Sequence, residues 1–203
     1  VRANVCNALT GIIQKHKVIL CERMHLSSHL DNQFTGFKRS FAGLIPLISY
    51  RWADAVLGVS SGVTRNLIDH FHVNSKKAHT IFNPYNIEAI RKASKEAPEV
   101  DLPSNFIVSA GRLTAAKNFK QLINAYLSST ETASLCILGE GEQREELNRY
   151  IKDRRAEKRI ILLGYAKNPF TIFSRAKYYI SASTNEGFPN ALLEAMTVGL
   201  PVI

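Results

Sequence analysis

Two carboxylates stand eight positions apart in the stretch NEGFPNALLEAM, in which Glu186 is followed by Gly-Phe-Pro-Asn and Glu194 comes near the end. Gly187 permits a close approach of the backbone, and Pro189 suits the first turn of a helix. The N–H groups of that turn lack intrahelical partners and can hold an anion or hydroxyl groups, and Glu194 can accept two neighbouring hydroxyls. Taken alone, the stretch is better explained by a capped surface helix with an exposed glutamate.

A second polar group, Arg112 and Lys117 in RLTAAKNFKQL, straddles a predicted turn from a strand to a helix. Two cations beside free N–H groups at the positive end of a helix suit a diphosphate. Two solvated surface cations are an equally acceptable interpretation of these residues alone. The glycine spacing and the Lys-Ser/Thr pair of a Walker A loop are missing.

Both groups follow predicted strands in residues 105–203, where strands and helices alternate as in a parallel sheet covered by helices. Ligands of such sheets bind beyond the carboxyl ends of the strands, so the residues after each strand are candidates for a site. Gly139, Gly141 and Gly164 mark turns at two further strand ends. The predicted strands are 106–111, 134–141, 160–165, 178–183 and 201–203, and the predicted helices are 119–129, 144–157, 169–176 and 190–199.

Residues 1–85 show the same alternation. Lys17–Glu22 has the pattern of a buried parallel strand, and Ser60 or Ser61 is suited to cap a helix. The charged residues 86–104, with two prolines, predict a short helix and a linker. We therefore expect an α/β chain with two parallel-sheet domains, 1–85 and 105–203, joined by a hinge at 86–104. The other elements predicted in the first domain are a helix within 41–50 and strands at 55–59 and within 76–86.

Composition is typical of a globular protein, with 45% hydrophobic and 21% charged residues among 203. No run approaches the roughly 20 apolar residues that span a bilayer, and no secretory leader is visible. The chain begins without Met and stops at the strand-like run GLPVI. We expect it to be a piece of a longer protein, with both domains incomplete.

The net charge of +9 is unevenly distributed, with 13 Lys/Arg and 6 Asp/Glu in residues 1–96 against 13 and 11 in residues 97–203. A basic first part is typical of a surface that meets phosphate, lipid or nucleic acid, and equally of a solvated face without a partner. No RNP-like, zinc-finger or helix-turn-helix signature is present, which disfavours nucleic acid.

The three cysteines, Cys6, Cys21 and Cys136, are widely spaced in apolar surroundings. They lack metal-ligand spacing and predict buried free thiols in a reducing compartment. Five of the histidines show no metal-ligand spacing either, namely His16, His29, His70, His72 and His79.

Four segments, in order and spacing, resemble the donor-binding half of GT-B glycosyltransferases of the retaining family 4 type, also called glycosyltransferase group 1. The most specific element is the Glu-x7-Glu pair formed by Glu186 and Glu194. The resemblance spans about residues 52–203 and implies a GT-B fold with two Rossmann-like domains, of which 1–85 is on the acceptor side and 105–203 binds the donor. The segments are SAGRLTAAKNFKQLINAY, LGEGEQREEL, IILLGYAKN and STNEGFPNALLEAMTVGLPVI.

The resemblance implies roles for individual residues. Arg112 and Lys117 would neutralise the donor diphosphate in place of a divalent metal, so no metal and no other cofactor is expected. Glu186 would contact the transferred sugar and, with the two cations, form the catalytic group. Glu194 would grip the ribose diol. The other donor contacts implied are Gly164, Tyr165 and Ala166 around the base, and Gly187, Phe188, Pro189, Asn190 and Ala191 around sugar and phosphate oxygens.

One position departs from the pattern of the family. Many relatives carry a His after the strand that is VILCE in this chain, and here Arg23 occupies that place with His25 two residues further on. Both are therefore candidates for the first-domain side of the site. An ordinary polar loop residue is the alternative interpretation of His25.

The function implied is transfer of a sugar, with retention, from a nucleotide sugar, most simply a UDP-sugar. The implied acceptor is a glycan on a polyprenyl diphosphate or other lipid carrier, at the cytoplasmic face of the inner membrane in surface polysaccharide or lipopolysaccharide synthesis. The basic first part favours peripheral docking to anionic lipid. Two alternatives stay open: another GT-B enzyme, such as a UDP-sugar epimerase or a phosphorylase, and a non-catalytic subunit that binds sugar nucleotides.

Overall fold

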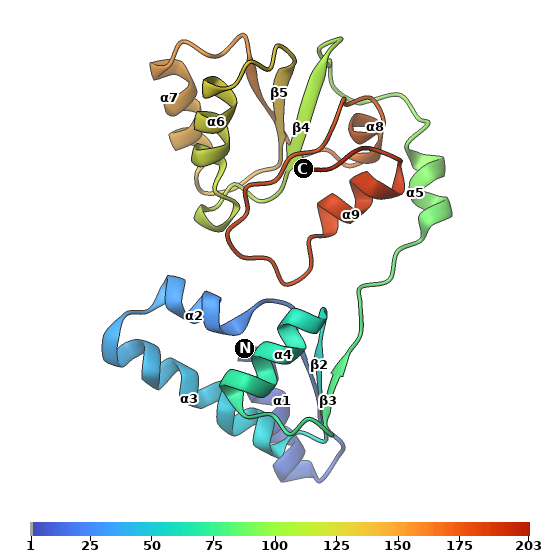
Figure 1. The fold of residues 1–203 in the computed structure, drawn as a ribbon. Helices are drawn as coiled ribbons and strands as arrows, with labels where there is room; N and C mark the ends of the chain where they lie inside the picture. The colour runs from blue at the N-terminus through green and yellow to red at the C-terminus, as the bar shows by residue number, and fades with distance from the viewer. Residues whose placement is uncertain (1) are drawn as a thin grey trace. The chain divides into compact units, whose positions relative to one another are not determined.

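The computed structural model describes residues 2–203, apart from four side chains, those of Arg2, Asn32, Gln33 and Ser40. By their contacts the described residues divide into two units. The first unit contains the chain up to Pro84 together with Asn185–Phe188, and the second contains Tyr85–Thr184 with Pro189–Ile203. Figure 1 shows the course of the chain.

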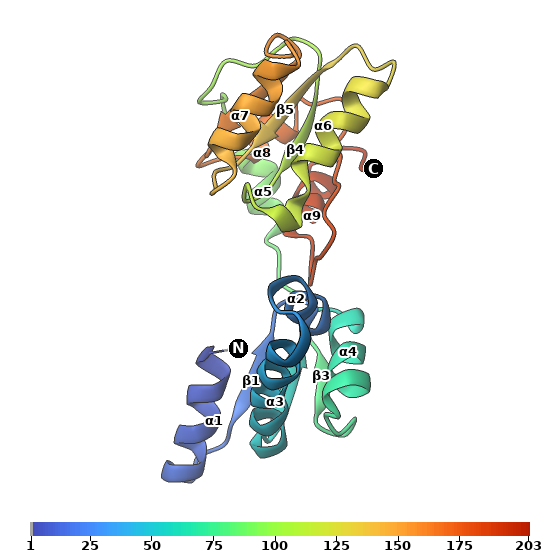
Figure 2. The same ribbon diagram turned by 90° about the vertical axis from the view of Figure 1, so that its left-hand side faces the viewer.

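The first unit is built on a parallel sheet of three strands in the order β1-β2-β3. Leu20 pairs with Val56 and Val56 with Ala78, which fixes the register across the sheet. Three of its helices, α1, α3 and α4, lie on one face of this sheet (Figures 1 and 2). The strands are β1 (Ile19–Glu22), β2 (Ala55–Gly58) and β3 (Ala78–Thr80), and the helices are α1 (Arg2–Gln14), α2 (Leu26–Gln33), α3 (Gly36–Trp52) and α4 (Ser61–Phe71).

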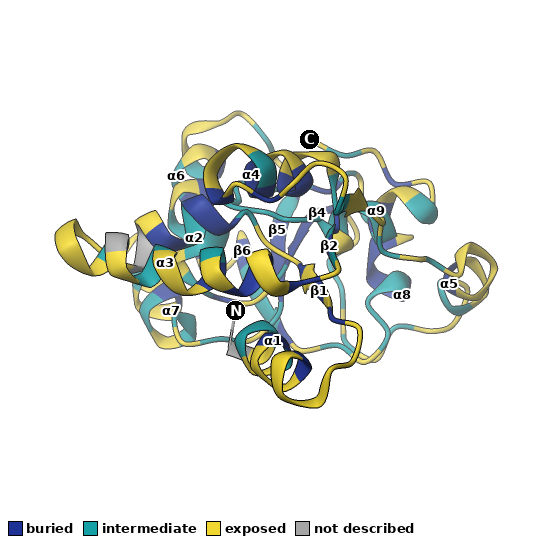
Figure 3. Cartoon of the chain, turned by 90° about the horizontal axis from the view of Figure 1, so that it is seen from below, coloured by how far each residue is buried: buried dark blue, intermediate teal, exposed yellow. Residues whose placement is uncertain are grey.

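Burial along β1 alternates, with Ile19 and Cys21 exposed and Leu20 and Glu22 buried. The prediction of a strand buried on both faces is therefore wrong, because the described helices cover one face of the sheet only. The prediction of buried thiols is wrong for the same reason at Cys21, and also at Cys6, which is exposed on α1. Figure 3 shows many further exposed residues on α1 and α3.

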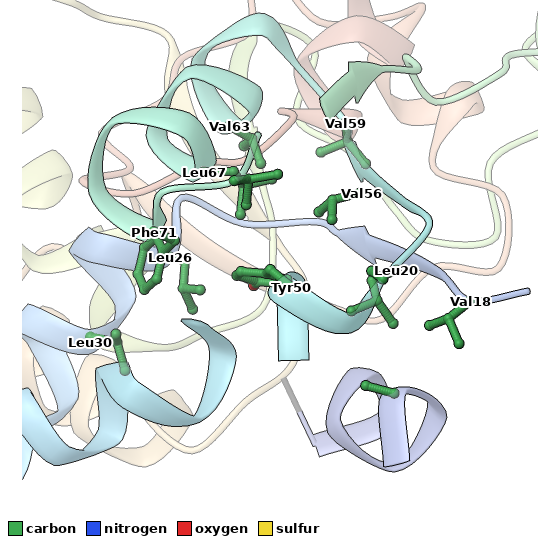
Figure 4. Close-up of a cluster of buried hydrophobic side chains, with 13 residues drawn as sticks. Val18, Leu20, Leu26, Leu30, Tyr50, Val56, Val59, Val63, Leu67 and Phe71 are labelled. Carbon is green, nitrogen blue, oxygen red and sulfur yellow. The ribbon is translucent and has the colours of Figure 1, made fainter. Parts of the chain in front are cut away.

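The core of the first unit lies between the sheet and these helices (Figure 4). Leu20 and Val56 contribute from the strands, and Tyr50 and Phe71 meet edge to face with their ring centroids 6.1 Å apart. Burying each such side chain stabilises the fold by about 1.5–3 kcal/mol. Helix α4 enters this core behind Ser60, whose side chain accepts a hydrogen bond from the Val63 N–H at 3.3 Å.

The second unit is a three-layer structure around a parallel sheet in the order β4-β5-β6. Helices α6 and α7 cover one face, and α5, α8 and α9 cover the other (Figure 1). All five residues of β4 are buried, as expected of a strand covered on both faces. The elements are β4 (Phe106–Ala110), β5 (Ser134–Leu138), β6 (Ile160–Gly164), α5 (Ile87–Ala93), α6 (Phe119–Ser128), α7 (Arg144–Asp153), α8 (Phe170–Phe173) and α9 (Asn190–Thr197).

The predicted strands 178–183 and 201–203 are present only as single parallel bridges, from Val108 to Tyr179 and from Tyr179 to Val202. Backbone hydrogen bonds accompany them, from the Ile180 N–H to the Val108 carbonyl at 2.9 Å and from the Ser181 N–H to the Ile203 carbonyl at 3.1 Å. Helices α1 and α2 were not predicted, and α2 starts at His25 without a side-chain cap. None of the described helices is both long and apolar enough to cross a bilayer.

The side chain of Glu131 links the start of β5 to the segment that contains Tyr179 by hydrogen bonds and an ion pair. Its carboxylate accepts hydrogen bonds from the Ala133 N–H at 2.9 Å and the Tyr178 hydroxyl at 2.8 Å, and it pairs with the Lys177 ammonium at 3.2 Å. The backbone hydrogen bond from Ala133, followed by that from Tyr178, lowers the pKa of Glu131 to about 2. The ionised form of this carboxyl is thus favoured in the folded state.

A carboxyl with a lowered pKa adds stability above its ordinary pKa of 4.5, and this contribution is lost as pH falls toward about 2. We expect Glu131→Gln to lower the Tm at pH 7 and the difference from the native protein to shrink between pH 4.5 and 2. Thermal unfolding followed by circular dichroism across this pH range measures both. Glu157→Gln, at an exposed position, is the control. An equal Tm difference at every pH would contradict the role of the ionised carboxylate.

Candidate functional site

A pocket of about 330 Å³ opens at the carboxyl ends of β4, β5 and β6. Turns after all three strands contribute to it, together with α8 and α9. This is the edge at which ligands of parallel sheets bind. The lining residues are Ala110, Gly111, Arg112, Leu138, Gly139, Glu140, Tyr165, Ala166, Pro169, Phe173, Ala191 and Glu194.

Backbone hydrogen bonds join the three strand-end turns in sequence. The Gly111 N–H donates to the Leu138 carbonyl at 2.9 Å, and the Gly139 N–H donates to the Gly164 carbonyl at 2.7 Å. Gly139 has a φ of +136°, and a Cβ at this position would overlap the carbonyl oxygen of Gly111. The floor of the pocket therefore requires glycine at this position.

The two predicted cations lie around the first of these turns. Arg112 is exposed and lines the pocket, whereas Lys117 ends the short 3-10 helix η1 (Ala115–Lys117) and is half-buried. The Lys117 ammonium nitrogen would stand 3.3 Å from a Cβ at Gly111, so it lies over the turn that ends β4. The Thr184 N–H donates to the Ala116 carbonyl at 3.0 Å and so joins Thr184 to η1.

Glu194 projects from α9 into the same pocket and is half-buried. Burial raises the pKa of its carboxyl. Within the described chain its side chain has no hydrogen-bond or ion-pair partner. A partly desolvated carboxylate of this kind is stabilised by any ligand that brings hydrogen-bond donors.

Helix α9 is held in place by α5 and the residues before it. The Tyr85 hydroxyl donates to the Asn190 side-chain oxygen at 2.5 Å, and the Arg91 guanidinium donates to the Thr197 carbonyl at 3.1 Å. These contacts join the two ends of α9 to the α5 region. Pro189 stands at the N-cap position, one residue before the helix begins.

The turn after β6 forms another wall. Gly164 is buried with a φ of +79°, and Tyr165 is 76% exposed at the mouth of the pocket beside Ala166. Glu140 lies next to Gly164 and pairs with the Arg144 guanidinium at 2.8 Å. An apolar pocket wall next to polar groups can accommodate a ligand that contains a flat ring with polar atoms at its edge.

The lining residues that were missed as site residues from the sequence include Glu140, Pro169 and Phe173. Glu140 stands two residues after the end of β5, and the strand-end rule would have found it had its acidic neighbours not been interpreted as helix initiation. Phe173 lies within α8 and gives no signal in the sequence, because its place in the pocket depends on how that helix packs.

The other candidates belong to the first unit. Arg23 is exposed directly after β1, and His25 precedes α2 with its ring Nδ1 2.9 Å from the Ser28 hydroxyl. The start of α2 is anchored to α4 by the buried Asn66, whose side-chain oxygen accepts from the Ser27 N–H at 3.2 Å. The ring of His25 is therefore oriented by a helix start that is itself fixed.

Asn185–Phe188 also falls in the first unit. A Cβ at Gly187 would overlap the Arg23 carbonyl oxygen, so the two backbones touch directly. Phe188 packs against the core, and its ring centroid lies 6.0 Å from that of Phe82. The structure thus groups Glu186, Gly187 and Phe188 with Arg23. It groups Arg112, Lys117 and Glu194 around the pocket of the second unit.

Among the described residues, no group of three or more His, Cys, Asp or Glu side chains could hold a metal ion. The groups that the site offers a ligand are cations, carboxylates, backbone N–H groups and apolar walls.

The sequence profile described as "Glycosyl transferases group 1" matches residues 90–203, which include every residue that lines the pocket. The chain belongs to this family. Its fold is the α/β fold of GT-B glycosyltransferases, with a parallel sheet of three described strands in each unit.

Two curated relatives illustrate the similarity. The N-acetylgalactosamine-N,N'-diacetylbacillosaminyl-diphospho-undecaprenol 4-alpha-N-acetylgalactosaminyltransferase of Campylobacter jejuni is 33% identical over 175 residues, covering 86% of this chain and 47% of the relative. The lipopolysaccharide 1,6-galactosyltransferase of Salmonella typhimurium is 29% identical over 158 residues, covering 75% of this chain and 43% of the relative. The chain thus spans about half the length of the curated relatives it matches.

Among solved structures, Anabaena Alr3699/HepE in complex with UDP superposes with a TM-score of 0.79 at 20% identity. The match covers 99% of this chain and 56% of the Anabaena chain. At this level of identity the match establishes a shared fold.

The contact between Gly139 and Gly111 generates a test of the pocket floor. We expect Gly139→Ala to destabilise the fold by about 1–3 kcal/mol, because the new methyl group forces the two turns apart. Urea unfolding measures the change. Gly62→Ala is the matched control, since a Cβ there has only the Ser60 hydroxyl oxygen at 3.9 Å. Equal stability of the two variants would show that the turns do not press on each other.

Proposed function

We propose that the protein transfers a hexosyl or N-acetylhexosaminyl group, with retention, from a UDP-sugar to a glycan on a lipid carrier. The observation that carries the proposal is the pocket at the strand ends. In a member of the group 1 family, it combines the cation Arg112 with the half-buried carboxylate of Glu194 and apolar walls. Each of these groups matches one part of a nucleotide sugar.

In this proposal Arg112 and Lys117 act on the diphosphate. When the bond between the sugar and the diphosphate breaks, its electron pair leaves with the diphosphate oxygen. Two fixed cations beside that oxygen stabilise the developing negative charge, a role that a divalent metal fills in other transferases. No metal or other cofactor is required.

Glu194 receives the ribose diol, and Gly164, Tyr165 and Ala166 line the base. The N–H groups in the first turn of α9, around Ala191, have no intrahelical acceptors and suit sugar or phosphate oxygens. The remaining contacts to these oxygens come from Gly187, Phe188, Pro189 and Asn190.

Glu186 contacts the transferred sugar and stabilises positive charge at the reacting carbon. Arg23 and His25 are the candidate site residues of the first unit. Front-face attack by the acceptor hydroxyl accounts for retention, because the new bond forms on the side from which the diphosphate leaves, and the hydroxyl proton passes to the departing diphosphate oxygen.

The names of the relatives support the choice of substrates. The Campylobacter enzyme is named for a diphospho-undecaprenol acceptor and the Salmonella enzyme for lipopolysaccharide, while the Anabaena structure holds UDP. We further propose that the reaction takes place at the cytoplasmic face of the inner membrane, with the protein bound peripherally. Transfer of this kind builds surface polysaccharide.

One observation favours a second candidate, a non-catalytic subunit that binds sugar nucleotides. Arg23, at the position where many relatives have His, is exposed after β1. Donor binding of normal strength without turnover on a panel of lipid-linked acceptors would favour this candidate. Turnover with release of UDP, followed by NMR, excludes it, and net turnover without release of UDP would indicate an epimerase.

The proposal predicts that donor binding depends on both cations. We expect Arg112→Ala and Lys117→Ala each to weaken UDP binding by about 10- to 100-fold, because each removes a charged hydrogen bond to phosphate. Isothermal titration of the intact protein with UDP measures this. Lys158→Ala, an exposed lysine after α7, is the matched control and should bind as the native protein does. Unchanged affinity in both site variants would refute the diphosphate site.

The raised pKa of Glu194 predicts opposite effects on stability and binding. Above the ordinary carboxyl pKa of 4.5, burial makes the ionised form costly, so stability is lost as pH rises through the raised pKa. We expect Glu194→Gln to have an equal or higher Tm at pH 7 and to bind UDP about tenfold or more weakly. Thermal unfolding and titration measure the two effects. A lower Tm with unchanged affinity would assign Glu194 a structural role instead.

A further inference from the structure

The pocket at the strand ends contains a further charged side chain, that of Glu140, which has no role in the proposed function. It projects from the turn after β5, where the Leu113 N–H donates to the Glu140 carbonyl at 2.9 Å. A Cβ at Gly141 would stand 2.4 Å from the Leu113 carbonyl oxygen, and Gly139 touches the Gly111 turn in the same way. The backbone that carries Glu140 is therefore packed against the neighbouring turn on both sides of this residue.

An ion pair holds the side chain as well. The Arg144 guanidinium, at the start of α7, donates to Glu140 Oε1 at 2.8 Å, and the Glu140 side chain is 50% exposed. The same oxygen would stand 3.0 Å from a Cβ at Gly164, so the carboxylate lies against the turn after β6. A carboxylate offers about four lone-pair positions, so an ion pair with one arginine leaves it able to accept a further hydrogen bond.

The turn after β6 is the wall that the proposed function assigns to the base. In that function Glu194 holds the ribose and Arg112 holds the diphosphate, which limits the positions open to the ring. Glu140 borders this wall at Gly164, and a group that only accepts hydrogen bonds requires a donor on the edge of the base. Uracil presents an N–H group at N3, between two carbonyl groups, whereas cytosine presents a lone pair at N3.

We propose that Glu140 is a specificity-determining residue, which selects uracil by accepting a hydrogen bond from its N3–H group. This inference rests on the proposed function and adds the residue that distinguishes one base from another. Cytosine in the same position would place the N3 lone pair against the carboxylate, and neither group would have a donor. Water still reaches the half-exposed carboxylate, so the preference is smaller than that of a fully buried group.

Isothermal titration of the intact protein with UDP and with CDP tests the proposal. The two nucleotides share their ribose and diphosphate, so the ratio of their dissociation constants reports on the base. We expect the native protein to prefer UDP by about 10- to 100-fold. Glu140→Gln should bring the two constants to within about threefold of each other, because an amide can turn its oxygen toward uracil or its NH₂ group toward cytosine.

Glu142→Gln is the matched control for this variant. It removes the same charge from the same turn, at a residue whose side chain is exposed. An effect of the charge on the diphosphate would change the binding of both nucleotides equally. We therefore expect Glu142→Gln to keep the preference of the native protein for UDP.

Arg144 is tested as the positioning residue of Glu140. We expect Arg144→Gln to reduce the preference for UDP several-fold, because the carboxylate loses the ion pair that fixes its orientation. Arg144→Lys should restore part of the preference, since an ammonium group can still pair with the carboxylate. Arg149→Gln, at an exposed position on α7, is the control and should leave the ratio unchanged.

Three results would overturn the proposal. Equal affinity of the native protein for UDP and CDP would show that the base is not selected. A ratio that Glu140→Gln leaves unchanged, with both nucleotides weakened alike, would assign Glu140 a structural role. In both cases UDP binding that depends on Arg112 would leave the proposed function intact. Absence of UDP binding by the native protein would overturn the donor site together with this inference.

Discussion

The hydrogen bonds between consecutive strand-end turns are the constraint on which the pocket depends. Gly139 lies directly under the Gly111 turn, and its N–H is bonded to the next turn along the sheet. The backbone groups at the centre of this edge are therefore satisfied by each other. Side chains from the edges of the turns, such as Arg112, remain to meet a ligand. The same backbone hydrogen bonds therefore explain why the floor of the pocket is rigid and why polar side chains lie at its edge.

Glu194 shows the complementary principle. Most buried or half-buried polar groups of this protein have partners, as Glu131 and Glu22 do. Glu194 is half-buried without one in the described chain, although α9 is fixed at both ends by Tyr85 and Arg91. A carboxylate without a partner on a rigid helix lowers the stability of the fold, but it places a hydrogen-bond acceptor in position for a ligand. Binding sites frequently contain polar groups of this kind.

The α/β class and most element positions could be predicted from the sequence because apolar runs and glycine turns are local signals. The sequence pattern gave wrong predictions where packing between residues that are distant in the sequence determines the local structure. Tyr179 makes a bridge rather than a strand, and β1 is covered on one face only. Phe173 reached the pocket through helix packing that no local pattern encodes. The roles of the site residues were predicted from the resemblance to a family. The spacing of these residues alone did not exclude the other interpretations, namely a surface helix and solvated cations.

The membership of Asn185–Phe188 in the first unit has a consequence for biosynthesis. The first unit is discontinuous in sequence, because Tyr85–Thr184 of the second unit separate Phe188 from the residues up to Pro84. A nascent chain cannot complete the first unit's contacts until residue 188 has left the ribosome. A polypeptide cut after the hinge would keep Phe82 and lose its aromatic partner. The last step in forming the first unit therefore comes after most of the second has been synthesised.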